Sequence, residues 1–234
     1  RWRGTCLPRL EEARDLSFVH GVTRARRRVL KRHGIATIDE LVGADVAALV
    51  AAGVPSDGLD RMRLQAKTLL AGRVVRNRLA GLPRGVKHEL YLRIEAEVLD
   101  RGEPFSIAWG EAAPRGAVDV ARVAIVSTRD ERAAALREMV EVLEAPASRD
   151  EPIYTFGAGT AGAFDALAEE LALEPARAGD LAGRFVDLAP WVRRAAVLPV
   201  FLYRFDEVAA VARNLPRPSA GQAEDALFVL HAGL

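Results

Sequence analysis

The sequence predicts two domains, an all-α domain followed by an α/β domain. Up to about residue 79 the apolar residues recur at three- and four-residue spacing, which is the period of amphipathic helices. Over residues 90 to 98 apolar and polar residues alternate instead, as in a strand with one buried face. The charge changes at the same place: the chain up to His88 carries 18 Lys and Arg against 8 Asp and Glu, and the remainder carries 15 against 24.

The first domain, residues 1 to 84, is predicted to consist of several short helices. Helices are expected to begin at Thr23, Thr37, Asp45 and Asp57, because Thr and Asp side chains accept hydrogen bonds from the unpaired N–H groups of a first helical turn. Glycines and a proline over residues 81 to 85 mark the expected domain boundary.

The second domain, residues 85 to 234, is predicted to be a mixed sheet with flanking helices, because three consecutive strands precede alternating helices and strands. Strands are expected at residues 90–98, 105–110, 118–126, 153–156 and 185–188, and helices at 128–143, 163–173, 205–214 and 222–230. The glycine-rich segment 157–162 lacks the spacing of a nucleotide-binding loop and is expected to form a flexible turn.

Composition excludes several classes of protein. The longest apolar run, residues 195 to 203, is far shorter than the roughly 20 residues of a membrane helix, so no membrane partner is expected. A single cysteine, Cys6, rules out an internal disulfide framework, and the absence of a leader favours a cytoplasmic protein. Because the chain begins with Arg1 rather than Met, we expect it to be part of a longer polypeptide.

The opposite charges of the two domains indicate different roles or mutual contact. A basic domain neutralises phosphates, whereas an acidic domain binds nucleic acid only through a metal ion or a partner's cations. A genomic preference for arginine would explain the number of arginines but not their segregation.

Residues 16–23, Leu-Ser-Phe-Val-His-Gly-Val-Thr, precede a basic helix, and His-Gly-Ile-Ala-Thr-Ile-Asp-Glu-Leu follows at residues 33–41. This arrangement resembles a helix-hairpin-helix module. The resemblance implies sequence-independent binding of the phosphate backbone of DNA or RNA at the N-terminus of the basic helix. The implied contact residues are Gly21, Val22, Thr23, Arg24, Arg26, Arg27, Arg28, Lys31 and Arg32. Thr23 departs from the family, which usually has a second hairpin glycine there; the alternative is a helical bundle with a solvated Arg-rich face.

Two short motifs in the second domain, Leu-Arg-Ile-Glu at residues 92–95 and Phe-Val-Asp-Leu at 185–188, suggest a family. With the preceding helical module, they resemble RecB-like putative nucleases, in which a ribonuclease H-like (DEDD-type) exonuclease domain follows a helix-hairpin-helix segment. The resemblance implies Mg²⁺ or Mn²⁺ as cofactor, with Glu95 and Asp187 as metal ligands and Asp165 as a further catalytic carboxylate.

The family pattern is incomplete in this chain. Arg93 replaces the Asp of the opening motif, and a guanidinium cannot ligate a cation. Asp225 is a poor substitute for the last family Asp. The alternative is that Glu95 and Asp187 are surface carboxylates, the former paired with Arg93.

The segment Arg-Trp-Arg-Gly-Thr-Cys at residues 1–6 resembles the end of the cysteine cluster that binds an iron–sulfur centre in the same family. A cluster needs several thiolates, so an iron–sulfur centre is expected only in a longer parent chain, with a missing upstream nuclease domain. Within this chain the alternative is a free thiol.

The expected function is therefore nucleic-acid binding in DNA processing or repair, with a degenerate metal-dependent phosphodiesterase site. Whether the chain is an enzyme is left open, because the set of catalytic carboxylates that the resemblance implies is incomplete. The alternative is a non-catalytic scaffold whose basic helical face binds a protein partner.

Overall fold

A computed structural model describes residues 8–76, 89–96, 104–112, 118–146, 148–200, 203 and 205–213. The chain forms two compact units: residues 1–79 with 193–214, and residues 80–192 with 215–234. This division differs from the expected one, 1–84 and 85–234. Residues 193–214 belong to the first unit although residues 80–192 of the second unit separate them from residues 1–79 in the sequence.

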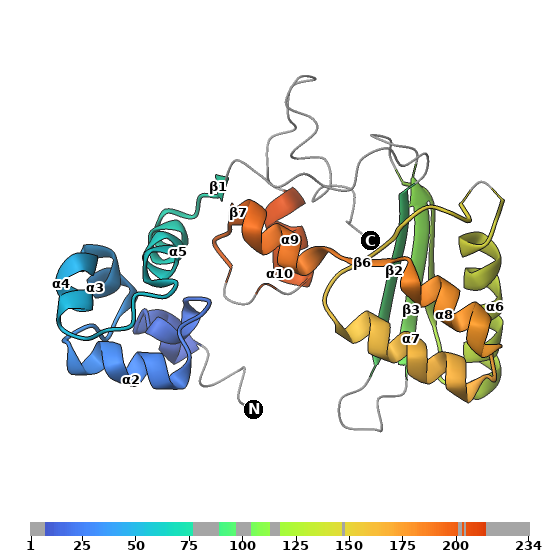
Figure 1. The fold of residues 1–234 in the computed structure, drawn as a ribbon, viewed down its shortest axis with the longest axis horizontal. Coiled ribbons are helices and arrows are strands. Elements are labelled where there is room, and N and C mark those ends of the chain that lie inside the picture. Colours follow the sequence, from blue (N-terminus) through green and yellow to red (C-terminus); the bar gives the residue numbers. More distant parts are fainter. Residues whose placement is uncertain are drawn as a thin grey trace, which may run out of the picture. The chain divides into compact units, whose positions relative to one another are not determined.

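The first unit contains short helices and one two-stranded ladder (Figure 1). Its elements are η1 (Leu16–Phe18), α2 (Arg24–Arg32), α3 (Ile38–Gly43), α4 (Val46–Ala51), α5 (Leu59–Ala71), β1 (Val75–Arg76), β7 (Ala196–Val197) and α10 (Phe205–Arg213). β1 and β7 pair antiparallel, with Val75 opposite Val197. The helices expected after Thr23, Thr37, Asp45 and Asp57 are present.

Side chains cap three of these helices as predicted. Thr23 accepts a hydrogen bond from the N–H of Arg26, Thr37 forms a capping box with Glu40, and Asp45 accepts from the first turn of α4. The prediction of a cap at Asp57 is wrong. α5 begins after Gly58, which adopts a left-handed conformation with φ of 66° and makes no side-chain cap.

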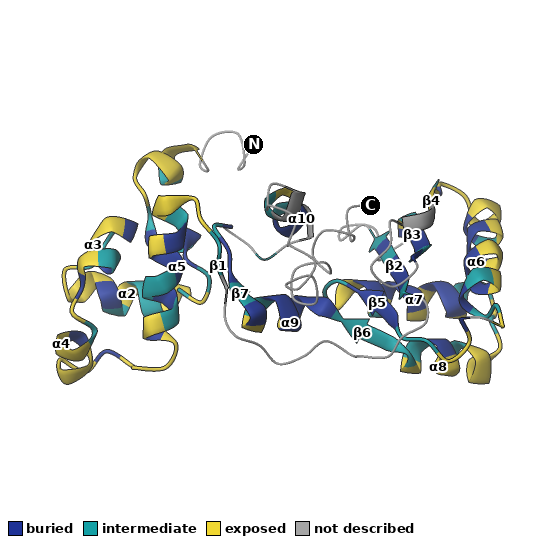
Figure 2. Ribbon diagram, turned by 90° about the horizontal axis from the view of Figure 1, so that it is seen from above, coloured by how far each residue is buried: buried dark blue, intermediate teal, exposed yellow. Residues whose placement is uncertain are grey.

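The core of the first unit lies between α5 and the shorter helices. Leu30, Leu41 and Leu59 are almost completely buried in one apolar cluster, and Val22 packs against its margin. Figure 2 shows buried positions along α5, whereas most of α4 is exposed. α5 is therefore the element against which the remaining helices of this unit pack.

The second unit is built on a five-stranded mixed sheet with flanking helices, so the predicted α/β class is confirmed. Its elements are β2 (Glu89–Ala96), β3 (Pro104–Ala112), β4 (Val118–Ile125), α6 (Arg129–Leu143), β5 (Ile153–Thr155), α7 (Gly159–Glu170), α8 (Pro175–Gly183), β6 (Phe185–Asp187) and α9 (Leu188–Ala195). The strand order is β4-β3-β2-β5-β6. β2, β3 and β4 form an antiparallel meander, and β5 and β6 continue the sheet parallel to β2.

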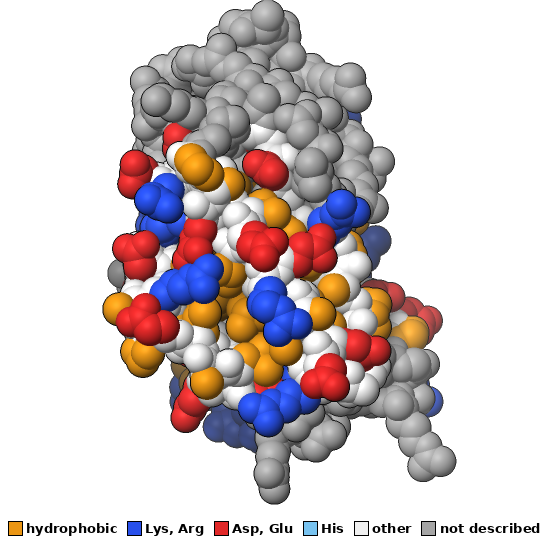
Figure 3. Space-filling view, turned by 90° about the vertical axis from the view of Figure 1, so that its right-hand side faces the viewer, with side chains coloured by type: hydrophobic (Ala, Val, Ile, Leu, Met, Phe, Trp, Pro, Cys, Tyr) orange, Lys and Arg blue, Asp and Glu red, His pale blue; other side chains and the backbone are white. Residues whose placement is uncertain are grey.

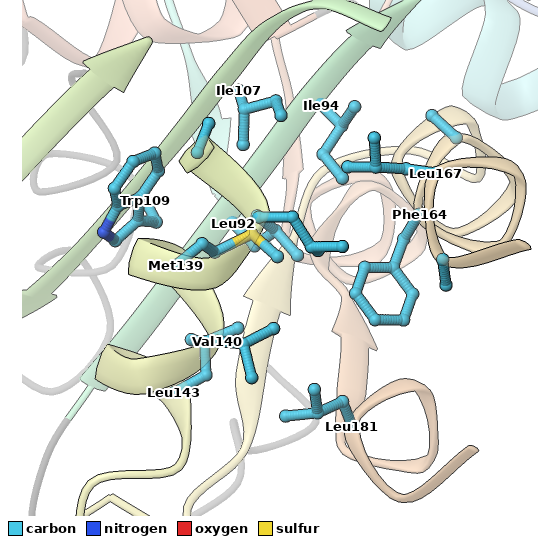
Figure 4. Packing of buried hydrophobic residues seen from close by; sticks show 14 of the residues in the cluster. Leu92, Ile94, Ile107, Trp109, Met139, Val140, Leu143, Phe164, Leu167 and Leu181 are labelled. Atoms are coloured by element: carbon cyan, nitrogen blue, oxygen red, sulfur yellow. The ribbon is translucent and has the colours of Figure 1, made fainter. Parts of the chain in front are cut away.

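β2 has two chemically different faces. Leu90, Leu92 and Ile94 belong to the apolar cluster that includes residues of α6, α7 and α8. Figure 4 shows Leu92 close to Met139 of α6, and Phe164 of α7 beside the same cluster. Residues at the intervening positions of β2 lie on the opposite face, as alternation along a strand requires.

Several elements were not expected from the sequence. α7 begins at Gly159, so the predicted flexible turn at 157–162 is wrong for most of its length. α8, α9, β1 and β7 are short elements without an extended periodic pattern. The expected helix at 222–230 lies outside the described residues. Within the described residues, no helix has both the length and the apolar character that crossing a membrane requires.

Arg184 stabilises the connection between α6 and β5 by hydrogen bonds. Its guanidinium donates hydrogen bonds to the carbonyl oxygens of Leu143 at 2.9 Å, Ser148 at 2.6 Å and Glu151 at 2.9 Å. A guanidinium suits this role because its donors have a fixed fork geometry. One side chain thereby satisfies three main-chain acceptors at this connection.

Replacing Arg184 with Ala is expected to lower the free energy of unfolding by about 2 to 4 kcal/mol, because three carbonyl oxygens lose a charged donor. Urea unfolding followed by tryptophan fluorescence measures the change. Arg149→Ala, an exposed position in the same connection, is the control and should change stability by less than about 0.5 kcal/mol. Equal stabilities of the two variants would contradict this role for Arg184.

Candidate nucleic-acid interface

A tight turn at residues 19–23 leads into α2. Gly21 has a φ of 88°, in the left-handed region where other residues are strained. A Cβ atom at this position would lie 3.8 Å from Met62, an ordinary contact, so backbone conformation rather than space requires glycine. Thr23 accepts from the Arg26 N–H at 3.2 Å, and the other first-turn N–H groups have no acceptor within the helix. This end of α2 therefore favours an anion.

Four exposed basic side chains follow this turn on one side of α2, and we term them the basic stripe: Arg24, Arg28, Lys31 and Arg32. With 3.6 residues per turn, Arg28 and Arg32 lie nearly opposite the buried Leu30, and Arg24 and Lys31 lie beside them. The stripe extends about 12 Å along the helix, which equals the axial rise of three to four phosphates on one DNA strand. It is the strongest concentration of exposed positive charge on a single described helix.

Two further predicted contact residues on α2 are engaged inside the first unit. Arg27 donates to a carboxylate oxygen of Asp15 at 2.9 Å. Arg26 donates to the carbonyl oxygen of Asp57 at 2.6 Å and lies 3.6 Å from its carboxylate. The structure thus brings together all the predicted residues of this site, but it divides the cations into an exposed stripe and a structural pair.

Asp15 remains ionised beside these cations. Burial alone would raise its pKa, but hydrogen bonds from Ser17 and the charges of Arg27 and Lys31 outweigh burial and lower it. Its negative charge is therefore committed to Arg27 and to the start of η1.

A second turn, residues 52–58, lies next to the first and was missed in the sequence. Arg26 links the two turns through its bond to Asp57, and a Cβ atom at Gly58 would lie 3.5 Å from the same Met62 that faces Gly21. The available signal was the repeated Gly-Val pair, at residues 21–22 and again at 53–54, a few residues before a helix. Asp57 is almost fully exposed, so this turn adds negative charge and does not extend the basic stripe.

His20 connects the first turn to α5. The backbone N–H of His20 donates to Oε1 of Gln65 at 3.0 Å, and the imidazole ring of His20 lies 5.0 Å from the ring of Tyr203. Burial, followed by the charges of Arg193 and Arg61, lowers the pKa of His20. The neutral form of the imidazole is therefore favoured over the charged form.

The predicted carboxylates of the second unit do not converge on one site. Glu95 lies on β2 and is held by Arg93, whose Nε donates to it at 2.9 Å. Asp165 is exposed in the middle of α7. Asp187 ends β6, which is separated from β2 by β5. Among the described residues, no group of three or more His, Cys, Asp or Glu could hold a metal ion.

Asp187 instead has a structural role that its contacts explain. One carboxylate oxygen accepts the N–H of Gly157 at 2.7 Å and the N–H of Ala189 at 2.9 Å. The second bond caps α9, and the first fixes the connection between β5 and α7. With Arg93 bound to Glu95 and Asp187 bound to two main-chain donors, these residues do not fit a two-metal centre.

Two tyrosines lie on the same sheet face as Arg93. Tyr91 donates from its hydroxyl to Glu89 at 2.6 Å, and its ring lies 5.9 Å from that of Tyr154. Burial raises the pKa of Tyr91, and it raises the pKa of Tyr154 to about 12. Both hydroxyls stay protonated at neutral pH, so neither is a general base.

The second unit contains a groove of about 570 Å³. It lies between α6 and the segment joining α7 to α8, and Figure 3 looks onto this side of the unit. Three arginines and three acidic residues line it around an apolar floor. This balance of charge does not favour a polyanion.

The capping role of Asp187 is tested by two substitutions. Asp187→Ala is expected to destabilise the protein by about 1 to 2 kcal/mol, whereas Asp187→Asn keeps the acceptor oxygen and should cost less than about 0.5 kcal/mol. Thermal unfolding with and without Mg²⁺ measures both, and Asp165→Ala is the exposed control. A melting temperature that Mg²⁺ raises in the unaltered protein but not in Asp187→Asn would contradict the structural role.

The chain was also compared with known proteins. No protein-family model, no curated protein and no solved structure matches it.

Proposed function

We propose that the chain binds DNA or RNA through the phosphate backbone, using the turn at residues 19–23 and the basic stripe of α2. The observation that carries this proposal is the exposure of four cations on successive turns of one helix, beside a helix N-terminus. None of the four forms an ion pair in the part of the chain that the structure describes. Such a surface recognises charge and spacing, not base sequence.

The local geometry supports a helix-hairpin-helix interpretation of this unit. A helical turn at residues 8–12 and η1 precede the first turn, and α2 follows it. The second turn between α4 and α5 has the same order of helix, turn and helix. The left-handed Gly21 gives the chain reversal that such a module needs.

For the second unit we propose a ribonuclease H-like domain whose metal site is degenerate. Support comes from the sheet, in which an antiparallel meander lies on one side of β2 and two parallel strands lie on the other. The degenerate site is supported by Arg93, which lies where the resemblance expects an acidic ligand and binds Glu95. This unit then acts in DNA processing or repair as a nuclease-derived module without its own turnover.

The binding proposal predicts a steep salt dependence. Fluorescence anisotropy with labelled single- and double-stranded DNA and RNA should give a slope of log K against log salt of roughly −3 to −4, because about four phosphates are neutralised. Replacing the four stripe residues with Gln should flatten this slope toward zero. Arg26 and Arg27 are left intact, because their contacts stabilise the first unit.

The matched control removes four exposed charges elsewhere, at Lys67, Arg73, Arg137 and Arg149. It should leave the slope nearly unchanged, because these charges lie outside α2, although the net charge equals that of the stripe variant. Equal slopes for both variants would show binding by overall charge and contradict a site on α2. Absence of binding to every probe would refute the proposed function and favour the protein-binding scaffold.

A second prediction concerns catalysis. With Mg²⁺ or Mn²⁺ the chain should cleave none of these substrates, because a charge about 4 Å away repels a divalent ion by roughly 8 kcal/mol at an effective dielectric of 20. Gel analysis of labelled DNA and RNA measures cleavage, and Arg93→Asp tests whether removal of the cation restores metal binding. Robust turnover by the unaltered chain that Asp187→Asn abolishes would refute the degenerate site.

A further inference from the structure

The chain returns to the first unit in the last turn of α9 and packs on α5. We term residues 193–200 together with Tyr203 the return segment. Arg61 of α5 donates to the carbonyl oxygens of Arg193 and Ala196, the latter at 3.3 Å. β7 pairs with β1 beside these bonds. The return segment is thus part of the unit that carries the basic stripe.

Gln65 joins the return segment to the first turn. Its side chain is almost completely buried. Nε2 donates to the carbonyl oxygen of Val200 at 3.0 Å, and Oε1 accepts the N–H of His20 at 3.0 Å. Because one partner is only an acceptor and the other only a donor, the amide has a single satisfactory orientation. His20 directly precedes Gly21, so Val200 and the turn are connected through one side chain.

Tyr203 closes the return segment on itself, independently of Gln65. Its hydroxyl accepts the N–H of Leu198 at 3.0 Å and donates to the carbonyl oxygen of Ala196 at 3.4 Å. Its ring contacts His20. The segment is therefore closed by its own tyrosine on the side that faces the turn.

We propose that Gln65 is a positioning residue for the turn at residues 19–23, and that docking of the return segment controls the affinity of this turn for phosphate. The effect on phosphate affinity rests on the proposed nucleic-acid-binding function. When the segment is docked, Val200 occupies the amide N–H₂ of Gln65 and directs the oxygen to His20. When the return segment is displaced, the side-chain amide of Gln65 reorients freely. The backbone N–H of His20, the residue before Gly21, then loses its acceptor.

The primary test is Tyr203→Phe, which removes the hydroxyl that closes the return segment but keeps the ring beside His20. Phosphate-backbone binding should weaken at least about 5-fold, the lower end of typical coupling between sites. The salt slope should not change, because every cation of the stripe is retained. Hydrogen exchange of the His20 amide should become faster, while protection within α3 stays the same.

Gln65→Glu and Gln65→Met separate the two bonds. Glu retains an acceptor for His20 but places a carboxylate against the Val200 carbonyl oxygen, so it should displace the return segment. Met removes both bonds and should give the fastest His20 exchange of the series. Lys67→Gln, an exposed change on the same helix, is the control and should match the unaltered protein.

Unchanged His20 exchange in Tyr203→Phe and in the Gln65 variants would overturn the inference. If either Gln65 variant fails to fold, Tyr203→Phe still decides the outcome, because it removes no buried amide. The exchange measurement also separates this inference from the proposed function. Faster His20 exchange without any nucleic-acid binding would retain the coupling and refute only the binding function.

Discussion

Helix α5 carries the interaction on which the first unit depends, the burial of Gln65 between two segments that are distant in the sequence. A buried amide without partners costs about 1 to 3 kcal/mol, so the position is stable only when both the turn and the return segment supply their bonds. Arg61 adds bonds to the same segment from the preceding turn of the helix. The fold of the first unit is thereby tied to residues that lie beyond residues 80–192 of the second unit in the sequence.

In the second unit the equivalent constraint is the alternation of side chains along β2. One face is apolar and must be covered, which α6, α7 and α8 do. The opposite face carries Tyr91, Arg93 and Glu95, whose bonds are made to one another or to neighbouring residues. A face that satisfies its own charges in this way has little capacity left to bind a divalent ion.

The basic residues of α2 also differ in whether their charges are bonded within the unit. Arg26 and Arg27 have acceptors within reach and contribute to the packing of the turns. The four residues of the basic stripe are exposed, and none of them forms an ion pair with a carboxylate of the described residues, although Lys31 lies near enough to Asp15 for its charge to act on that group. Exposed cations keep their hydration and remain able to exchange counterions for phosphates.

Local patterns in the sequence determined the class of each unit and most of its elements. The caps at Thr23, Thr37 and Thr128 depend on residues three positions away, so they are visible in the sequence alone. The strand alternation in β2 and the positions of the basic stripe are likewise local, because they follow from the strand and helix periods.

Only the tertiary structure decided which charged and polar side chains form hydrogen bonds or ion pairs with residues distant in the sequence. Arg26 and Asp57 are 31 positions apart, and Gln65 and Val200 are 135 positions apart, so no local period relates them. β1 and β7 are two residues long and α8 begins at a proline, which leaves little periodic signal to detect. Asp187 matched a metal ligand in the sequence, yet its bonds to Gly157 and Ala189 make it a cap. The residue type determines what a side chain is able to bind, whereas the tertiary fold determines which binding partner lies within reach of it.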